Sequence, residues 1–142
     1  MLDTIKKAAE NFCIHQIREP HKIKDGSTNK RTLIAYIDID TQDNKRYRVY
    51  IASDEAFVQK VSQLFLEEEQ SDEETLQDML LETLNLIVGS AKVIAQETTQ
   101  TPFVIQTPKF EKIGDFNFET DDAITVEIGE KEFTIAIKEI DV

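Results

Sequence analysis

A carboxylate and a carboxamide three residues apart are the best candidates for chemistry in this chain. Glu82 and Asn85 lie in a long segment whose apolar residues recur with helical spacing. Residues at i and i+3 are neighbours on a helix surface, so both side chains can touch one ligand or partner. A carboxamide cannot act as a general base, but it can orient a water molecule, as a Gln does in some GTPases.

Both residues belong to a narrow polar stripe on a predicted helix over residues 72–97. At about 100° per residue, the stripe spans roughly 80°, and apolar residues, Leu86 among them, cover most of the remaining circumference. Asn is a mediocre helix former, and glycine inside a helix costs about 1 kcal/mol relative to alanine. These two unfavourable choices ask for a reason, but the residues alone leave both an ordinary solvated helix face and a functional stripe open. The stripe consists of Asp78, Glu82, Asn85, Gly89, Lys92 and Gln96.

The N-terminal half predicts helices around a β-hairpin. A helix over residues 2–17 is followed by strands at 31–40 and 45–52, both of which alternate with period two. Ser53 is the expected N-cap of a further helix that ends near Leu66. An acidic connector then leads to the long helix.

The C-terminal half predicts the long helix followed by β-structure. Ser71 and Glu74 form an expected capping box, and Pro102 follows the end of the helix. The second hairpin turns at Gly129 and resembles the first in its alternation, which indicates two pseudo-repeated halves. The fold class is therefore α+β, with long helices packed on an antiparallel sheet. The expected strands are 103–107, 116–118, 123–128 and 132–140.

Length and charge narrow the function classes. The 142 residues predict one domain over residues 1–142, large enough for its own core. The net charge is −12, and residues 61–142 hold 19 acidic against 5 basic residues. Nucleic acid and anionic membranes are poor partners for such a surface, because binding phosphates needs clustered Lys and Arg.

Other signals for catalysis or targeting are weak. Lys6 and Lys7 interrupt a secretory signal, and no apolar run is long enough for a membrane span. The lone Cys13 fits a small core residue in a reducing cytoplasm. The acidic hairpin at Asp38, Asp40 and Asp43 lacks the Gly and the bidentate Glu of an EF-hand, so no metal site is expected. Nucleotide-binding and serine-hydrolase motifs do not occur in the sequence.

The long helix carries a recognisable pattern. Glu82-x-x-Asn85-x-x-x-Gly89-x-Ala91-Lys92, after an acidic connector, resembles the signature of the CheC/CheX/FliY family of bacterial chemotaxis phosphatases. The order of elements and the single motif look most like CheX. CheC-type proteins tend to carry the motif in both halves, whereas neither Glu10 nor Glu55 has an Asn three residues later. One site per chain is implied.

The resemblance implies a function and a role for each motif residue. The substrate would be the phosphorylated aspartate of a CheY-type response regulator, and the regulator would bring its own Mg²⁺. Asn85 would position the attacking water, and Glu82 would form a salt bridge with the regulator's lysine. Gly89 would let the partner approach closely, while Lys92 and Asp78 would contact it. This chain would bind no cofactor, because phosphoryl transfer needs mostly positioning and charge neutralisation.

Two alternatives remain at this point. A domain of the same fold can bind a phosphorylated regulator without hydrolysing it, and a structural or flagellar-switch component is a further option. Binding and water positioning would use the same polar stripe, so the residues alone do not separate these functions. The family's dimers imply a homodimer, with residues 132–140 as the expected edge of the sheet.

Overall fold

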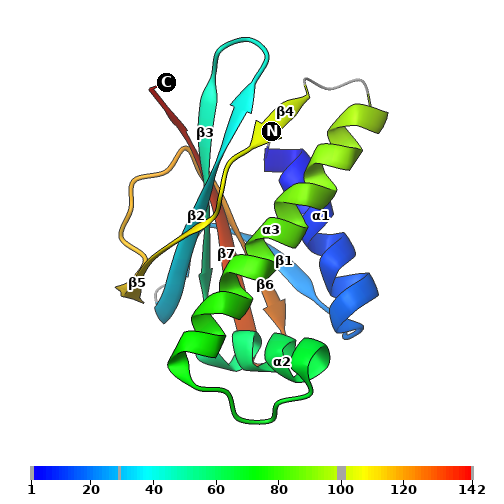
Figure 1. Cartoon of the computed structure of the whole chain (residues 1–142), viewed down its shortest axis with the longest axis vertical. Coiled ribbons are helices and arrows are strands. Elements are labelled where there is room, and N and C mark those ends of the chain that lie inside the picture. The colour runs from blue at the N-terminus through cyan, green and yellow to red at the C-terminus, as the bar shows by residue number, and fades with distance from the viewer. Residues whose placement is uncertain (1, 29, 99–101, 142) are drawn as a thin grey trace.

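The computed structural model describes residues 2–28, 30–98 and 102–141. Within these residues, three α-helices lie on one face of a single seven-stranded antiparallel sheet (Figure 1), which confirms the predicted α+β class. The elements are α1 (Leu2–Phe12), a π-helical turn η1 (Cys13–Ile17), β1 (Lys22–Asp25), β2 (Arg31–Thr41), β3 (Arg46–Ser53), α2 (Glu55–Leu66), α3 (Glu73–Glu97), β4 (Phe103–Ile105), β5 (Lys109–Asp115), β6 (Asp122–Ile128) and β7 (Lys131–Ile140).

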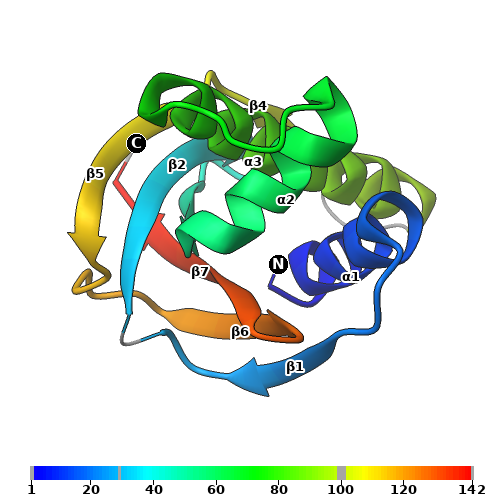
Figure 2. The same ribbon diagram turned by 90° about the horizontal axis from the view of Figure 1, so that it is seen from below.

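The sheet brings the two predicted hairpins together. Its strand order is β1-β6-β7-β3-β2-β4, and β5 pairs with the first part of β2, next to β4. The hairpins β2–β3 and β6–β7 meet through the pairing of β3 with β7. Figure 2 shows the sheet curving from β5 round to β1 about the side that carries the helices. The proposed duplication of two halves stays a prediction.

One strand assignment has to be corrected for its position. The prediction that residues 132–140 end the sheet is wrong, because β7 pairs with β3 on one side and with β6 on the other. From Phe133 to Ile137 its backbone is paired on both sides, so no partner strand can add to this stretch. The sheet edges are β1 at one end and β4 with β5 at the other.

The main core lies between the sheet and the helices. Alternate residues of the central strands, such as Val49, Ile51 and Ile135, point to this side and are fully buried. Leu80 and Leu84 of α3 are equally buried and belong to the same cluster. This packing holds α3 against the sheet, and it also holds α3 against α1 and α2.

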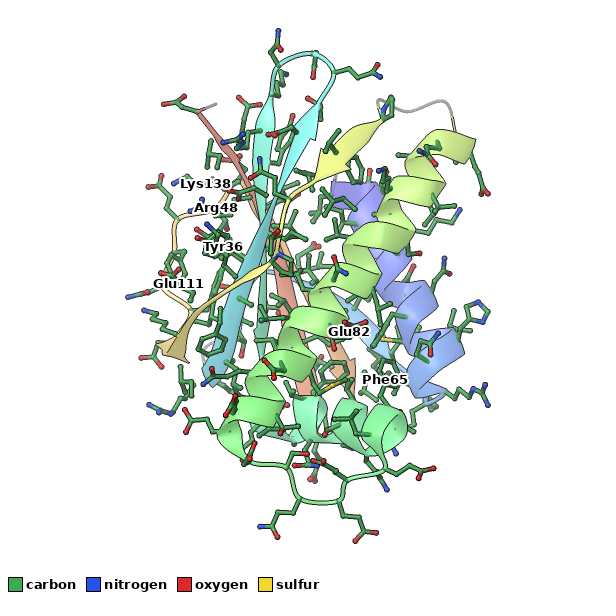
Figure 3. The ribbon with its side chains drawn as sticks, in the orientation of Figure 1. Tyr36, Arg48, Phe65, Glu82, Glu111 and Lys138 are labelled. Carbon is green, nitrogen blue, oxygen red and sulfur yellow. The ribbon has the colours of Figure 1, made fainter. Side chains whose placement is uncertain are left out.

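The opposite face of the sheet carries a smaller cluster and, among the described residues, no helix. The connection after β5 covers it, because Phe118 stacks on Tyr50 with ring centroids 4.9 Å apart and Phe116 meets the same ring at 5.6 Å. The predicted strand at 116–118 is therefore wrong: its two aromatic residues alternate, but they pack onto a sheet face and pair with no strand. In Figure 3, Tyr36 and Arg48 lie on this helix-free side.

Two strands were missed by the periodicity. β1 has four residues, three of them charged and exposed, so its only strand signal is its pairing with β6. β5 mixes charged residues with Phe110 and Ile113 and is joined to β2 across a register shift. Neither strand has the alternation of hydrophobic and polar residues on which the prediction depended. Both are edge strands, and the hydrogen bonds to one neighbouring strand hold them in place.

The helix caps differ from the expected ones by one residue. Asp54, not Ser53, caps α2, and Asp72, not Ser71, caps α3 through a bond from the Thr75 N–H at 2.8 Å. Asp54 does more than cap, because Oδ1 accepts from the Phe57 N–H at 2.8 Å and Oδ2 from the Glu132 N–H at 2.9 Å. Desolvation raises the pKa of this carboxyl above its usual value.

Candidate functional site

The predicted site residues lie on the outer face of α3. The helix buries Leu80, Leu84 and Ile87 against the core, which leaves Glu82 and Asn85 exposed on the opposite side. Figure 3 shows Glu82 near the middle of this helix. Because both flanks of the helix are packed, the backbone that carries the two side chains is fixed in place.

Neither Glu82 nor Asn85 makes a hydrogen bond or an ion pair with another described residue. The buried neighbour Thr83 differs, since its hydroxyl donates to the Met79 carbonyl at 2.8 Å. On a helix, residues at i and i+3 place their Cβ atoms about 5–6 Å apart. The carboxylate and the carboxamide are therefore adjacent and free to bind a partner.

Gly89 lies on the same face, one turn beyond Asn85. A Cβ added at this position would meet nothing within 4 Å beyond the local helix backbone. Nor does the residue adopt a left-handed conformation. The fold of this chain therefore does not require glycine at position 89. Only contact with another molecule would give the missing side chain a role.

The other two predicted residues lie in different surroundings. Asp78 is exposed one turn before Glu82 and extends the same face. Lys92 is half-buried and lines a groove of about 290 Å³ between α3 and β4, together with Phe103 and Val104. The structure thus groups Asp78, Glu82 and Asn85 with Gly89, while Lys92 borders a separate depression.

The exposed face is also more apolar than the sequence predicted. Leu86 is 38% exposed and Val93 is 50% exposed, although Leu86 was assigned to the buried side. The helical geometry contained the signal, because residues four apart differ by only about 40° around the axis and Leu86 is four residues from Glu82. Leu86 lies at the margin of a wide apolar face, and the sequence pattern alone predicted it to be part of the core.

The chemistry available at this site is limited to orientation and charge. No group of three His, Cys, Asp or Glu residues in the described part of the chain could hold a metal ion. The acidic hairpin is neutralised internally, since Arg48 binds Asp38 at 2.9 and 3.1 Å and Arg46 binds Asp40 at 2.6 and 3.1 Å.

Among the described helices, none has the length and apolarity needed to cross a bilayer.

Cys13 offers no nucleophile. The residue is fully buried where α1 passes into the π-helical turn, and burial raises the pKa of its thiol to about 12. The reactive form of cysteine is the thiolate, which such an environment disfavours. A structural role agrees with the prediction from sequence.

Comparison with solved structures shows the same fold in chemotaxis proteins. The CheX crystal structure from Vibrio vulnificus matches with a TM-score of 0.78 at 18% identity, covering 97% of this chain and 95% of that one. The CheX–CheY–BeF₃–Mg²⁺ complex from Borrelia burgdorferi matches with 0.72 at 19% identity, covering 96% and 97%. FliY from Thermotoga maritima matches with 0.57 at 15% identity, covering 95% and 83%.

Comparison of the sequence gives the family. No curated protein matches it at a significant level. The family model described as chemotaxis phosphatase CheX matches residues 35–131, more than half of the chain, and this stretch includes all of α3. The chain therefore belongs to the CheX family of chemotaxis phosphatases.

Proposed function

We propose that this protein hydrolyses the aspartyl phosphate of a CheY-type response regulator, with Glu82 and Asn85 as its catalytic residues. The observation that carries the proposal is the pair itself: both side chains are exposed, unbonded and adjacent on a rigid helix of a CheX-family chain. The Borrelia burgdorferi structure is a complex of CheX with CheY, BeF₃ and Mg²⁺, and it supports the choice of partner class.

In the proposed reaction, Asn85 holds a water molecule in line with the phosphorus atom. The bond from the water oxygen to phosphorus forms as the bond from phosphorus to the aspartate oxygen breaks. Inorganic phosphate leaves with the water oxygen and one of its protons, the second proton passes to the solvent, and the regulator recovers its free carboxylate. Glu82 forms an ion pair with a lysine at the regulator's active site, which fixes the register of the two proteins. Phosphoryl transfer passes through a loose transition state, which needs positioning of the reactants more than covalent assistance from the enzyme.

The Mg²⁺ ion belongs to the regulator in this scheme. The exposed face of α3 offers it no set of ligands, in agreement with the absence of a metal-binding group in the described residues. Hard cations of this kind take several oxygen ligands in octahedral geometry. Glu82 alone does not provide such a site, so its role is pairing with a cation of the partner.

The second candidate function is a binding module that recognises the phosphorylated regulator without hydrolysis. The fold is shared with FliY as well as with CheX, and a fold by itself does not specify activity. In that case Glu82 and Asn85 would contact the regulator only. The two functions differ in one measurable quantity, the lifetime of the phosphorylated regulator.

The test is the decay of phosphorylated CheY-type regulators from the same bacterium, with and without this protein and its Asn85→Ala variant. We expect acceleration by the wild type and a loss on the order of 10²-fold in the variant, as for other lost positioning groups. Because Asn85 is exposed and unbonded, the variant should fold normally. A folded variant with full activity would refute the role of Asn85.

Two further expectations from the sequence stay predictions. The first is a homodimer, which light scattering can test, and which would have to avoid the interior strand β7. The second is a cytoplasmic location, which cell fractionation can test. Neither is needed for the reaction described above.

A further inference from the structure

A small groove lies beside the proposed site, between α1 and α3. Its volume is about 170 Å³, and Leu86 and Ser90 line it from α3. Ala8 and Phe12 of α1 line it as well, and both are buried residues of the main core. We call this depression the α1–α3 groove. Leu86 lies one helix turn from Glu82 on the exposed side of α3, so the groove opens beside the catalytic pair.

The rim of the α1–α3 groove is polar and contains no carboxylate, lysine or arginine. Asn11, His15 and Gln16 border it on the side of α1, and Ser90 borders it on the side of α3. None of these four side chains bonds to another described residue. An apolar floor with a few free polar groups around it is the usual composition of a binding pocket.

The size of a stable interface requires contacts beyond the exposed face of α3. A specific complex buries about 800 Å² on each partner and involves about 20–30 residues a side. The exposed ridge around Glu82, Asn85 and Gly89 provides only a few of them. A regulator that brings its phosphoryl group to Asn85 must therefore cover the surface next to α3 as well.

The α1–α3 groove fits this need better than the groove on the other side of α3. Both grooves have apolar walls, formed by Leu86, Ala8 and Phe12 in one and by Phe103 and Val104 in the other. Only the second groove also carries charged side chains of opposite sign, Asp40 and Lys92. Central contacts in protein interfaces are enriched in apolar side chains and depleted of charge. A dry cavity of about 150 Å³ holds one benzene ring, so 170 Å³ has room for one side chain of that size.

We propose that the α1–α3 groove receives one apolar side chain of the phosphorylated regulator, from the surface next to its phosphoaspartate. This inference rests on the proposed function, because the regulator is the occupant. The groove anchors the partner, and Glu82 and Asn85 act on the phosphoryl group. Five of its seven lining residues lie on α1 and η1, outside the motif that identifies the catalytic pair.

Two groove variants and one matched control test the inference. Leu86→Asp places a charge in the wall, and Ser90→Leu fills the groove without adding charge. The control is Leu64→Asp, since Leu64 of α2 is 40% exposed, almost equal to Leu86, and does not line the groove. The probe is a CheY-type regulator bound to beryllium fluoride and Mg²⁺, which mimics the phosphorylated state and is not hydrolysed.

We expect the dissociation constant to rise at least tenfold in both groove variants and less than twofold in the control. Binding within twofold of the wild type in both groove variants would overturn the inference. If Leu86→Asp proves unfolded by circular dichroism, Ser90→Leu decides the question alone. If the wild type binds no regulator of the bacterium, both the groove and the proposed function fail.

The same experiment separates failure of the groove from failure of catalysis. Tight binding without accelerated hydrolysis would refute the phosphatase, while the effect of Leu86→Asp on binding still tests the groove. Hydrolysis that depends on Asn85, with groove variants that bind normally, would refute the groove and leave the phosphatase intact. Measured together, the dissociation constant and the decay rate distinguish the four possible results, in which the groove and the phosphatase are each supported or refuted.

Discussion

Replacing Gly89 with alanine should stabilise the protein and impair its action on the regulator. The gain in stability arises within this chain, whereas the loss of activity arises at its contact with the regulator. Within this chain, the glycine lies in the interior of α3 with an ordinary helical conformation and open space where a Cβ would lie. Against a docked partner, the same methyl group would lie one turn from Asn85, on the face that the partner must cover.

The stability gain follows from the local structure. Glycine in a helix interior is less favourable than alanine by about 0.5–1 kcal/mol, mostly through the entropy of the unfolded chain. No clash offsets this gain at Gly89. For a domain of this size, about 1 kcal/mol corresponds to a rise in Tm of about 4 °C. Gly129→Ala is the matched control and should destabilise, because Gly129 has a φ of 61° in the β6–β7 turn.

The loss of activity follows from the distance at which the partner packs. A displacement of about 1 Å at the reacting atoms can lower a rate by about 10²-fold. We therefore expect Gly89→Ala to slow hydrolysis of the phosphorylated regulator by between about tenfold and 10²-fold, and Gly89→Leu to slow it further. Calorimetry gives Tm, and the decay of phosphorylated regulator gives the rate.

The combination of results is decisive for the role of Gly89. A more stable variant with wild-type activity would show that the partner does not approach this turn of α3, and it would refute the docking role. A variant that loses stability would refute the account of its local environment instead. Only greater stability together with slower hydrolysis agrees with both parts of the reasoning.

Three further outcomes are expected from the packing. Asp54→Asn should lower the free energy of unfolding by about 1–3 kcal/mol, because the one carbonyl oxygen of the new asparagine cannot accept from both the Phe57 and the Glu132 N–H. Asp72 accepts from one backbone donor only, so the control Asp72→Asn should change the free energy of unfolding by only a few tenths of a kcal/mol, on the order of the difference between cap residues. Leu80→Ala should cost about 2–5 kcal/mol in a denaturant titration, and a smaller loss would contradict its complete burial. Cys13, with its thiol pKa raised to about 12, should react with iodoacetamide at pH 8 only after unfolding; labelling of the native protein at the rate of a free thiol would count against its burial.

Several features of this protein were determined locally and could be read from the sequence. Apolar residues at helical spacing define α3, and period-two alternation defines β2, β3, β6 and β7. The motif residues Glu82 and Asn85 face outward because the same spacing turns their neighbours inward. Such patterns depend on which residues are neighbours along the chain, so they need no knowledge of distant contacts.

Other features depend on contacts between distant segments. β1 and β5 exist because β6 and β2 present open edges to them. Phe116 and Phe118 cover a sheet face that the pairing of β3 with β7 creates. Sequence reasoning placed β7 at an edge, since alternation records which side is buried but not how many strands lie beside it.

The site shows the same division. The shared exposed face of Glu82 and Asn85 could be predicted, because one helix turn brings the two residues together. The α1–α3 groove could not, because Leu86 and the residues of α1 are more than 60 positions apart and meet only through helix packing. Helical periodicity determines what one helix presents to its surroundings, whereas only the tertiary structure decides which second surface lies beside it.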